Sequence, residues 1–179
     1  SIGQRILFHD IPATTDDEHQ LVFKVLATKG GIHAYDFLCA YNQSNVGDLA
    51  IVMNECGPDW QNDKDYPGIC EALQADEFAF AYVPDDPFLS KDTSTQSRID
   101  AFELTYGDRT IKILADEPIT DVSMTLFHGD SKGDLIPNGT DTGDTYIWYT
   151  LSWTSSSTDV LIEMAGHLSV SGDYGVYPI

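Results

Sequence analysis

Positively charged side chains are scarce in this chain of 179 residues. Nine Lys and Arg stand against 29 Asp and Glu, which gives a formal net charge of -20 at pH 7. Nucleic acids and anionic membrane surfaces carry negative charge themselves, so a protein of this charge repels them. The composition therefore argues against both as partners. The same charge destabilises a folded monomer by self-repulsion unless cations or a partner neutralise it.

Long apolar runs are also lacking. No stretch of 18 apolar residues occurs, so the sequence predicts no membrane-spanning helix. The chain begins with Ser1 rather than Met, and Ser and Thr are abundant while Lys is scarce. These features are expected of a secreted protein whose leader has been removed. We therefore predict an extracellular or cell-surface location.

Cysteine is rare, and the three positions predict one crosslink. Cys56 and Cys70 flank a loop rich in Pro, Gly, Asp and Asn. A disulfide that closed this loop would contribute about 3 kcal/mol through the entropy of the unfolded chain. The spacing, and the lack of a nearby His, argue against a zinc site. Cys39 lies in an apolar run and is expected to be a buried free thiol.

Apolar residues alternate with polar ones or form short runs between turn residues, which is the pattern of β-strands. The fold class that this pattern favours is all-β: an antiparallel β-sandwich, jelly-roll or immunoglobulin-like, with few or no long helices. Residues 99–114 are expected to form a hairpin that turns at Gly107 and Asp108, preceded by a polar loop over residues 84–97. The other expected strands are residues 20–28, 34–41 (or a short helix), 77–83, 122–128, 145–154 and 160–170.

The chain length favours a single sandwich domain, residues 12–179, preceded by an apolar arm, residues 1–11. The arm has two interpretations. It forms the first strand of its own sheet, or it adds to the open edge of a neighbouring subunit, as in donor-strand polymers. In the second case the subunit interface would include Ile2, Ile6, Leu7 and Phe8.

Aspartates gather in Gly-rich segments between two predicted strands, residues 129–134 and 138–144. Glycine lets the backbone turn so that several oxygens converge, and calcium takes about six to eight oxygen ligands. The pattern is not an EF-hand, because no Glu falls at its last position. Asp–Gly loops also serve simply as turns. The candidate calcium ligands are Asp130, Asp134, Asp141 and Asp144, with Asp63 and Asp65 of the cysteine loop as a second group.

Motifs for catalysis are missing. No Gly-x-Ser-x-Gly elbow and no phosphate-binding Gly loop before a helix occur. We therefore predict that the protein is not an enzyme, although 29 acidic residues leave room for a pair of catalytic carboxylates. Trp148, Tyr149 and Trp153 alternate between the faces of one predicted strand. This indicates core plus interface rather than a carbohydrate platform.

The segment Gly30-Gly31-Ile32-His33-Ala34-Tyr35-Asp36-Phe37-Leu38 resembles a Gly-Gly-x-His-x-x-Asp-aromatic-Leu motif of uncharacterised, secreted prokaryotic β-domains. A later Gly-His in those sequences is similar to Gly166-His167 here. The resemblance implies a secreted β-domain with His33, Asp36 and His167 as motif residues. If the strands of His33 and His167 are neighbours, the two histidines could face each other or share Asp36, and imidazole and carboxylate together would suit a transition metal. The alternative is a buried, hydrogen-bonded His that orders a loop. More loosely, the chain is similar to subunits of extracellular filaments and tubes, including cannula proteins, which implies calcium use and donor-strand assembly.

Together these features predict a secreted structural subunit that polymerises with copies of itself into a filament or tube. Strand addition by residues 1–11 would join the subunits, and calcium would bridge their acidic faces. The alternative is a calcium-dependent ligand- or carbohydrate-binding or adhesin module. That alternative predicts a monomer with an exposed aromatic patch and an amino terminus in its own sheet. A third reading, a hydrolase, requires a cleft that holds paired carboxylates or an open cluster of the motif residues.

Overall fold

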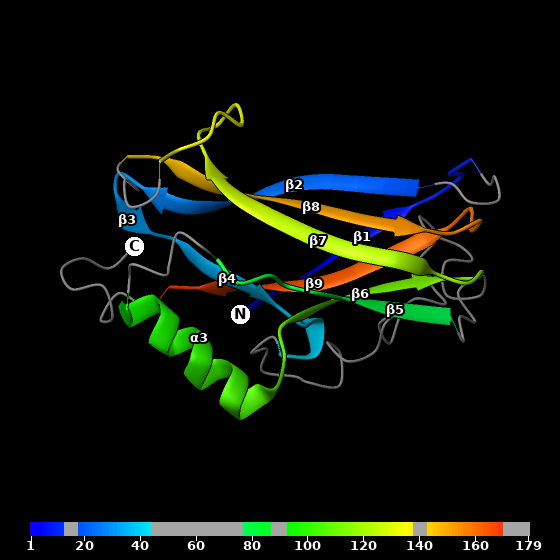
Figure 1. The fold of residues 1–179 in the computed structure, drawn as a ribbon, viewed down its shortest axis with the longest axis horizontal. Helices are drawn as coiled ribbons and strands as arrows, with labels where there is room; N and C mark the ends of the chain where they lie inside the picture. Colours follow the sequence, from blue (N-terminus) through cyan, green and yellow to red (C-terminus); the bar gives the residue numbers. More distant parts are fainter. Residues whose placement is uncertain (13–17, 44–76, 87–92, 138–142, 170–179) are drawn as a thin grey trace, which may run out of the picture.

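Two antiparallel β-sheets packed face to face make up the fold (Figure 1), so the predicted all-β sandwich is confirmed. The computed structural model describes residues 1–12, 18–43, 77–86, 93–137 and 143–169. The first sheet has the order β1-β9-β6-β5, with β4 also paired to β9. Its strands are β1 (Ile2–Phe8), β4 (Tyr35–Cys39), β5 (Glu77–Tyr82), β6 (Thr110–Ala115) and β9 (Val160–Leu168).

The second sheet has the order β3-β2-β8-β7. A short 3-10 turn, η1 (Tyr41–Gln43), follows β4, and one α-helix among the described residues, α3 (Thr93–Tyr106), precedes β6. The strands of the second sheet are β2 (Glu18–Lys29), β3 (Ile32–His33), β7 (Thr120–Gly129) and β8 (Thr145–Thr154).

The hydrophobic core lies between the sheets because strand alternation sends every second side chain inward. On β8 the inward residues Ile147, Tyr149, Leu151 and Trp153 are all part of this core. Trp148 lies between them in sequence and is only half-buried, on the outer face of the second sheet. The predicted division of the three aromatic residues between the two faces of this strand is therefore confirmed.

The amino-terminal arm is a strand of its own sheet in the single chain. All seven residues of β1 pair antiparallel with β9, from Ile2 opposite Gly166 to Phe8 opposite Val160. Ile6 and Phe8 pack against the core, while Ile2 and Leu7 are more peripheral. β1 pairs with no other strand in the described part of the chain, so it forms one edge of the first sheet.

The predicted hairpin over residues 99–114 is wrong in its first half. Residues 99–106 belong to α3, which begins at Thr93, so the end of the predicted polar loop is helical as well. Ile99, Phe102 and Tyr106 follow helical spacing, and the rings of Phe102 and Tyr106 are 4.8 Å apart. A short apolar run of this kind fits both the two-residue period of a strand and the 3.6-residue period of a helix. Packing against the sheet decides that these residues form a helix.

α3 covers the outer face of the first sheet beside β4 (Figure 1). Ile99 and Phe102 pack on Phe37 and Cys39 of β4 in a second, smaller core. The helix ends at Tyr106, and the next residue, Gly107, has a φ of 85° that suits glycine and an amide that donates to the carbonyl of Glu103. The predicted turn residue was thus correctly placed, but it ends a helix rather than a strand. The end of α3 borders a groove on the outer face of the first sheet.

Candidate ligand-binding groove

Four strands of the first sheet contribute one row of side chains to its outer face. Phe80 of β5 is paired with Lys112 of β6, and Lys112 is paired with Glu163 of β9. Glu163 is paired in turn with Arg5 of β1. Directly opposed residues of antiparallel strands point to the same face. The adjacent Ile162 belongs to the core, so this row points outward, away from the second sheet.

A groove with a volume of about 450 Å³ lies over this row. Its floor comes from β5, β6 and β9, and its walls come from η1 and from the residues that end and follow α3. Three aromatic rings, two amide side chains and three ionisable side chains from the described residues line it. The described lining residues are Ala40, Tyr41, Asn42, Gln43, Phe80, Tyr106, Asp108, Thr110, Lys112 and Glu163.

Gln43 ties the two walls of the groove together. Its Oε1 accepts a hydrogen bond from the amide of Ala40 at 2.8 Å, and its Nε2 donates to the carbonyl of Tyr106 at 2.9 Å. The first bond stabilises η1, and the second joins η1 to the end of α3. Tyr41 and Tyr106 are therefore presented from neighbouring, mutually supported segments. A groove with supported walls loses less conformational entropy when a ligand binds.

Glu163 is the buried charged group of the groove, with only 3% of its surface exposed. Its Oε1 accepts a hydrogen bond from Arg5 Nε at 2.7 Å. The Arg5 guanidinium also lies 4.5 Å from the centre of the Tyr41 ring, within range of a cation–π contact. Arg5 thus compensates the buried carboxylate and orients one aromatic wall.

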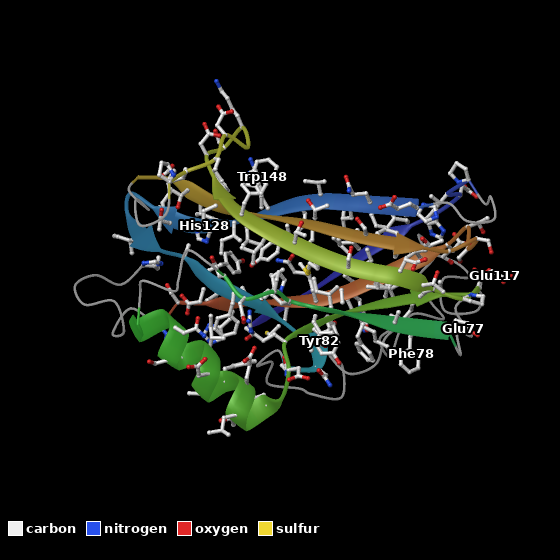
Figure 2. All side chains as sticks on the ribbon, viewed as in Figure 1. Glu77, Phe78, Tyr82, Glu117, His128 and Trp148 are labelled. Atoms are coloured by element: carbon white, nitrogen blue, oxygen red, sulfur yellow. The ribbon has the colours of Figure 1, made fainter. Side chains whose placement is uncertain are left out.

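Exposed aromatic residues continue beyond the groove along β5. Phe78, Phe80 and Tyr82 lie on one face of the strand and are 55%, 46% and 65% exposed. Figure 2 shows Phe78 and Tyr82 on the side of β5 that points away from the second sheet. Large apolar side chains gathered on one surface mark binding sites more often than scattered ones do. Sequence alternation alone did not single out this row, because each side of β5 carries apolar residues.

The structure brings together two of the three motif residues. Asp36 and His167 lie on the paired strands β4 and β9, and His167 Nδ1 is 3.2 Å from Asp36 Oδ2. Arg98 of α3 approaches the same oxygen at 3.6 Å, and the His167 ring stacks on Phe37 at 4.4 Å. The Asp36 side chain has no exposed surface. This arrangement joins α3 to the sheet, and of the two motif histidines it is His167 that contacts Asp36.

His33 is placed elsewhere, on β3 of the second sheet. Its carbonyl accepts a hydrogen bond from Ser169 Oγ at 2.5 Å. Within the described ranges, no group of three or more His, Cys, Asp or Glu residues is arranged to hold a metal ion. The motif residues are therefore not gathered into one site in this part of the molecule.

Two of the candidate calcium ligands are used in turns. Asp130 Oδ1 accepts hydrogen bonds from the amides of Lys132 and Asp134 at 2.7 and 3.0 Å, and these bonds lower the pKa of Asp130. Asp144 accepts from Lys29 Nζ at 2.5 Å, and that bond lowers the pKa of Asp144. These contacts satisfy the carboxylates without an ion. Calcium binding by these residues and Asp134 stays a prediction.

Other sequence candidates fall outside the described residues. These are the predicted calcium ligands Asp63, Asp65 and Asp141 and the predicted disulfide of Cys56 and Cys70. Cys39 is described: it is fully buried on β4 as a free thiol, and burial raises its pKa.

Sequence reasoning missed two pairs of ionisable side chains, of which His128, Asp86 and Arg109 are buried. His128 Nε2 and Asp86 Oδ2 are 2.7 Å apart, with both side chains almost fully buried. Arg109, also buried, donates from Nε to Glu103 Oε1 at 2.6 Å. These residues are isolated in the sequence and carry no motif. Only the folded structure brings each one to its partner.

Comparisons with protein-family models, with curated proteins and with solved structures found no match to this chain. No helix in the described ranges has the length and apolar character that crossing a membrane requires.

Proposed function

We propose that this domain is a carbohydrate-binding module and that the groove over β5, β6 and β9 is its binding site. One observation carries the proposal: a single hollow combines the rings of Tyr41, Phe80 and Tyr106 with amide and charged side chains. Sugar rings have apolar C–H faces and polar rims, so they pair well with aromatic faces flanked by planar hydrogen-bonding groups.

The contacts of the groove support binding rather than catalysis. Asp108 and Glu163 both line it, which is the minimum that a hydrolase would need. Glu163, however, is only 3% exposed and accepts a hydrogen bond from Arg5 Nε, so it is not open to a substrate as a catalytic acid or base must be. The exposed Asp108 carboxylate in the lining is suited to accept hydrogen bonds from sugar hydroxyls.

A glycan array followed by calorimetric titration of the best ligands tests this proposal. Tyr106→Ala and Phe80→Ala should each weaken binding about tenfold or more, because each removes one ring from the groove. Leu104→Ala is the matched control on α3, since Leu104 is 90% exposed and does not line the groove. Release of reducing sugar is measured in the same samples. Binding that survives both ring substitutions would place the site elsewhere, and turnover would favour the hydrolase.

The structural subunit predicted from the sequence is the second candidate, and β1 is the observation that favours it. This strand has seven residues and one partner strand among the described elements, so its outer edge can accept a strand from a neighbour. Donation of β1 to a neighbour would cost more free energy than acceptance of a strand at its edge, because Ile6 and Phe8 would leave their own core. Calcium would act in this candidate by neutralising the acidic subunit faces.

A reversible crosslink distinguishes donation from edge addition. Gln4 and Met164 are directly paired between β1 and β9, so Q4C/M164C would hold β1 in its own sheet when oxidised. Negative-stain microscopy with calcium and with chelator then compares the oxidised and reduced forms, with the unsubstituted protein treated identically. Filaments from the reduced form alone would indicate donation. Filaments from both would indicate addition at the edge, and dispersed particles throughout would contradict the structural-subunit candidate.

A further inference from the structure

The aromatic row on β5 extends past the groove in both directions. Phe80 lines the groove, whereas Phe78 and Tyr82 flank it two residues away on the same face. Alternate residues of a strand are roughly 7 Å apart, so the three rings span about 13 Å. That span exceeds one sugar ring. A ligand that used the whole row would therefore have to be a chain.

We infer that the site takes a linear, neutral polysaccharide that lies along β5 and contacts Phe78, Phe80 and Tyr82 in succession. This inference rests on the proposed carbohydrate-binding function and specifies its ligand. The groove holds one repeating unit of the chain, and the flanking rings hold its neighbours on either side.

The charge of the protein selects a neutral chain. The net charge is -20, and Asp108 is an exposed carboxylate in the described groove lining, whereas Glu163 is buried and paired with Arg5. Lys112 is itself engaged over the Phe78 ring, with Nζ 5.2 Å from the ring centre. Polysaccharides rich in uronate or sulfate would be repelled by this field. Neutral sugars are not repelled and can donate hydrogen bonds to the exposed Asp108 carboxylate.

The angle between the Phe78 and Phe80 rings favours binding of a twisted polysaccharide chain over binding of a flat crystalline polysaccharide surface. The Phe78 and Phe80 rings are inclined at 70° with their centres 5.5 Å apart. Sugar units stacked on both rings would be rotated relative to one another. A single soluble chain can adopt this rotation, whereas chains fixed side by side in a crystal cannot.

The test is a length series of neutral oligosaccharides, from disaccharide to hexasaccharide, of the cellulose type and of the starch type. Affinity measured by calorimetry should rise with length. Phe78→Ala should weaken hexasaccharide binding about fivefold to tenfold, as expected for loss of one stacking ring, and leave disaccharide binding unchanged. Phe127→Ala is the control, because Phe127 stacks on Trp148 in the other sheet and should change neither. Oligogalacturonates of equal length should bind more weakly than the neutral series.

The outcomes separate this inference from the proposed function. Binding that is independent of length, or weakened equally at every length by Phe78→Ala, would refute the extended site and leave the groove as a site for single sugars. Stronger binding of oligogalacturonates or of crystalline cellulose would refute the neutral, twisted chain. A lack of binding at every length and on the array would overturn the proposed function, and the inference with it.

Discussion

Replacement of Asp36 by alanine should strongly destabilise the fold. The Asp36 carboxylate is inaccessible to solvent and contacts His167 of β9 and Arg98 of α3. It lies on β4, so one side chain connects three elements. Alanine removes the acceptor from both of these contacts.

The size of the effect follows from burial. Removal of one member of a fully buried charged pair costs about 3–5 kcal/mol. The partners Arg98 and His167 are 21% and 23% exposed, so water can reach them after the substitution. The free energy of unfolding should therefore fall by about 3 kcal/mol, the lower end of that range. For a chain of this size, this corresponds to a fall in melting temperature of roughly 6–12 °C.

Urea unfolding followed by circular dichroism measures the free energy of unfolding, and calorimetry measures the melting temperature. Asp36→Asn is the informative companion, since it keeps the volume and one acceptor oxygen and should recover part of the loss. Asp144→Ala is the contrasting control, because its pair with Lys29 is exposed and should matter much less. A loss for Asp36→Ala as small as that of this control would refute the reasoning that the three residues hold α3 on the sheet.

Three further predictions concern the core and the acidic loops. Leu151→Ala should lower the free energy of unfolding by about 3 kcal/mol in urea titrations, because Leu151 is fully buried between the sheets. Asp130 has a lowered pKa in the folded state, so its contribution is complete above the ordinary aspartate pKa and is lost as the pH falls through the lowered value. The melting-temperature gap between the wild type and Asp130→Ala should therefore shrink on acidification. Lys29→Met should increase any rise in melting temperature caused by calcium, because it frees the Asp144 carboxylate, and an unchanged calcium response would count against Asp144 as a ligand.

Alternation along β8 could be predicted because it is a local property of the backbone. Neighbouring side chains on a strand must point to opposite faces, whatever lies around them. Trp148 and Trp153 lie on opposite faces of β8, as this local rule predicts. The same argument could not decide the state of residues 99–106. In that segment the spacing of Ile99 and Phe102 fits a helix as well as a strand. The helix is favoured because it packs both side chains into the small core beside Phe37.

The aspartate-rich loop shows a different limit of sequence reasoning. Carboxylates at close spacing are suited both to binding an ion and to accepting amide hydrogen bonds in turns. Asp130 serves the second role in the structure, and its carbonyl also accepts a hydrogen bond from Trp148 Nε1 at 3.0 Å. The composition of the loop could not reveal this contact, because it depends on which face of β8 the tryptophan occupies.

By itself, the sequence determined the all-β class, the strongly acidic charge and the face on which each residue of β8 lies, since these follow from composition and from the two-residue period of a strand. Only the tertiary structure decided the groove. Arg5 and Glu163 are 158 residues apart in the chain, and Phe80 and Lys112 come from two further strands. Strand order and register alone bring these side chains into one row, because pairing between distant strands depends on how the whole core packs rather than on any local pattern.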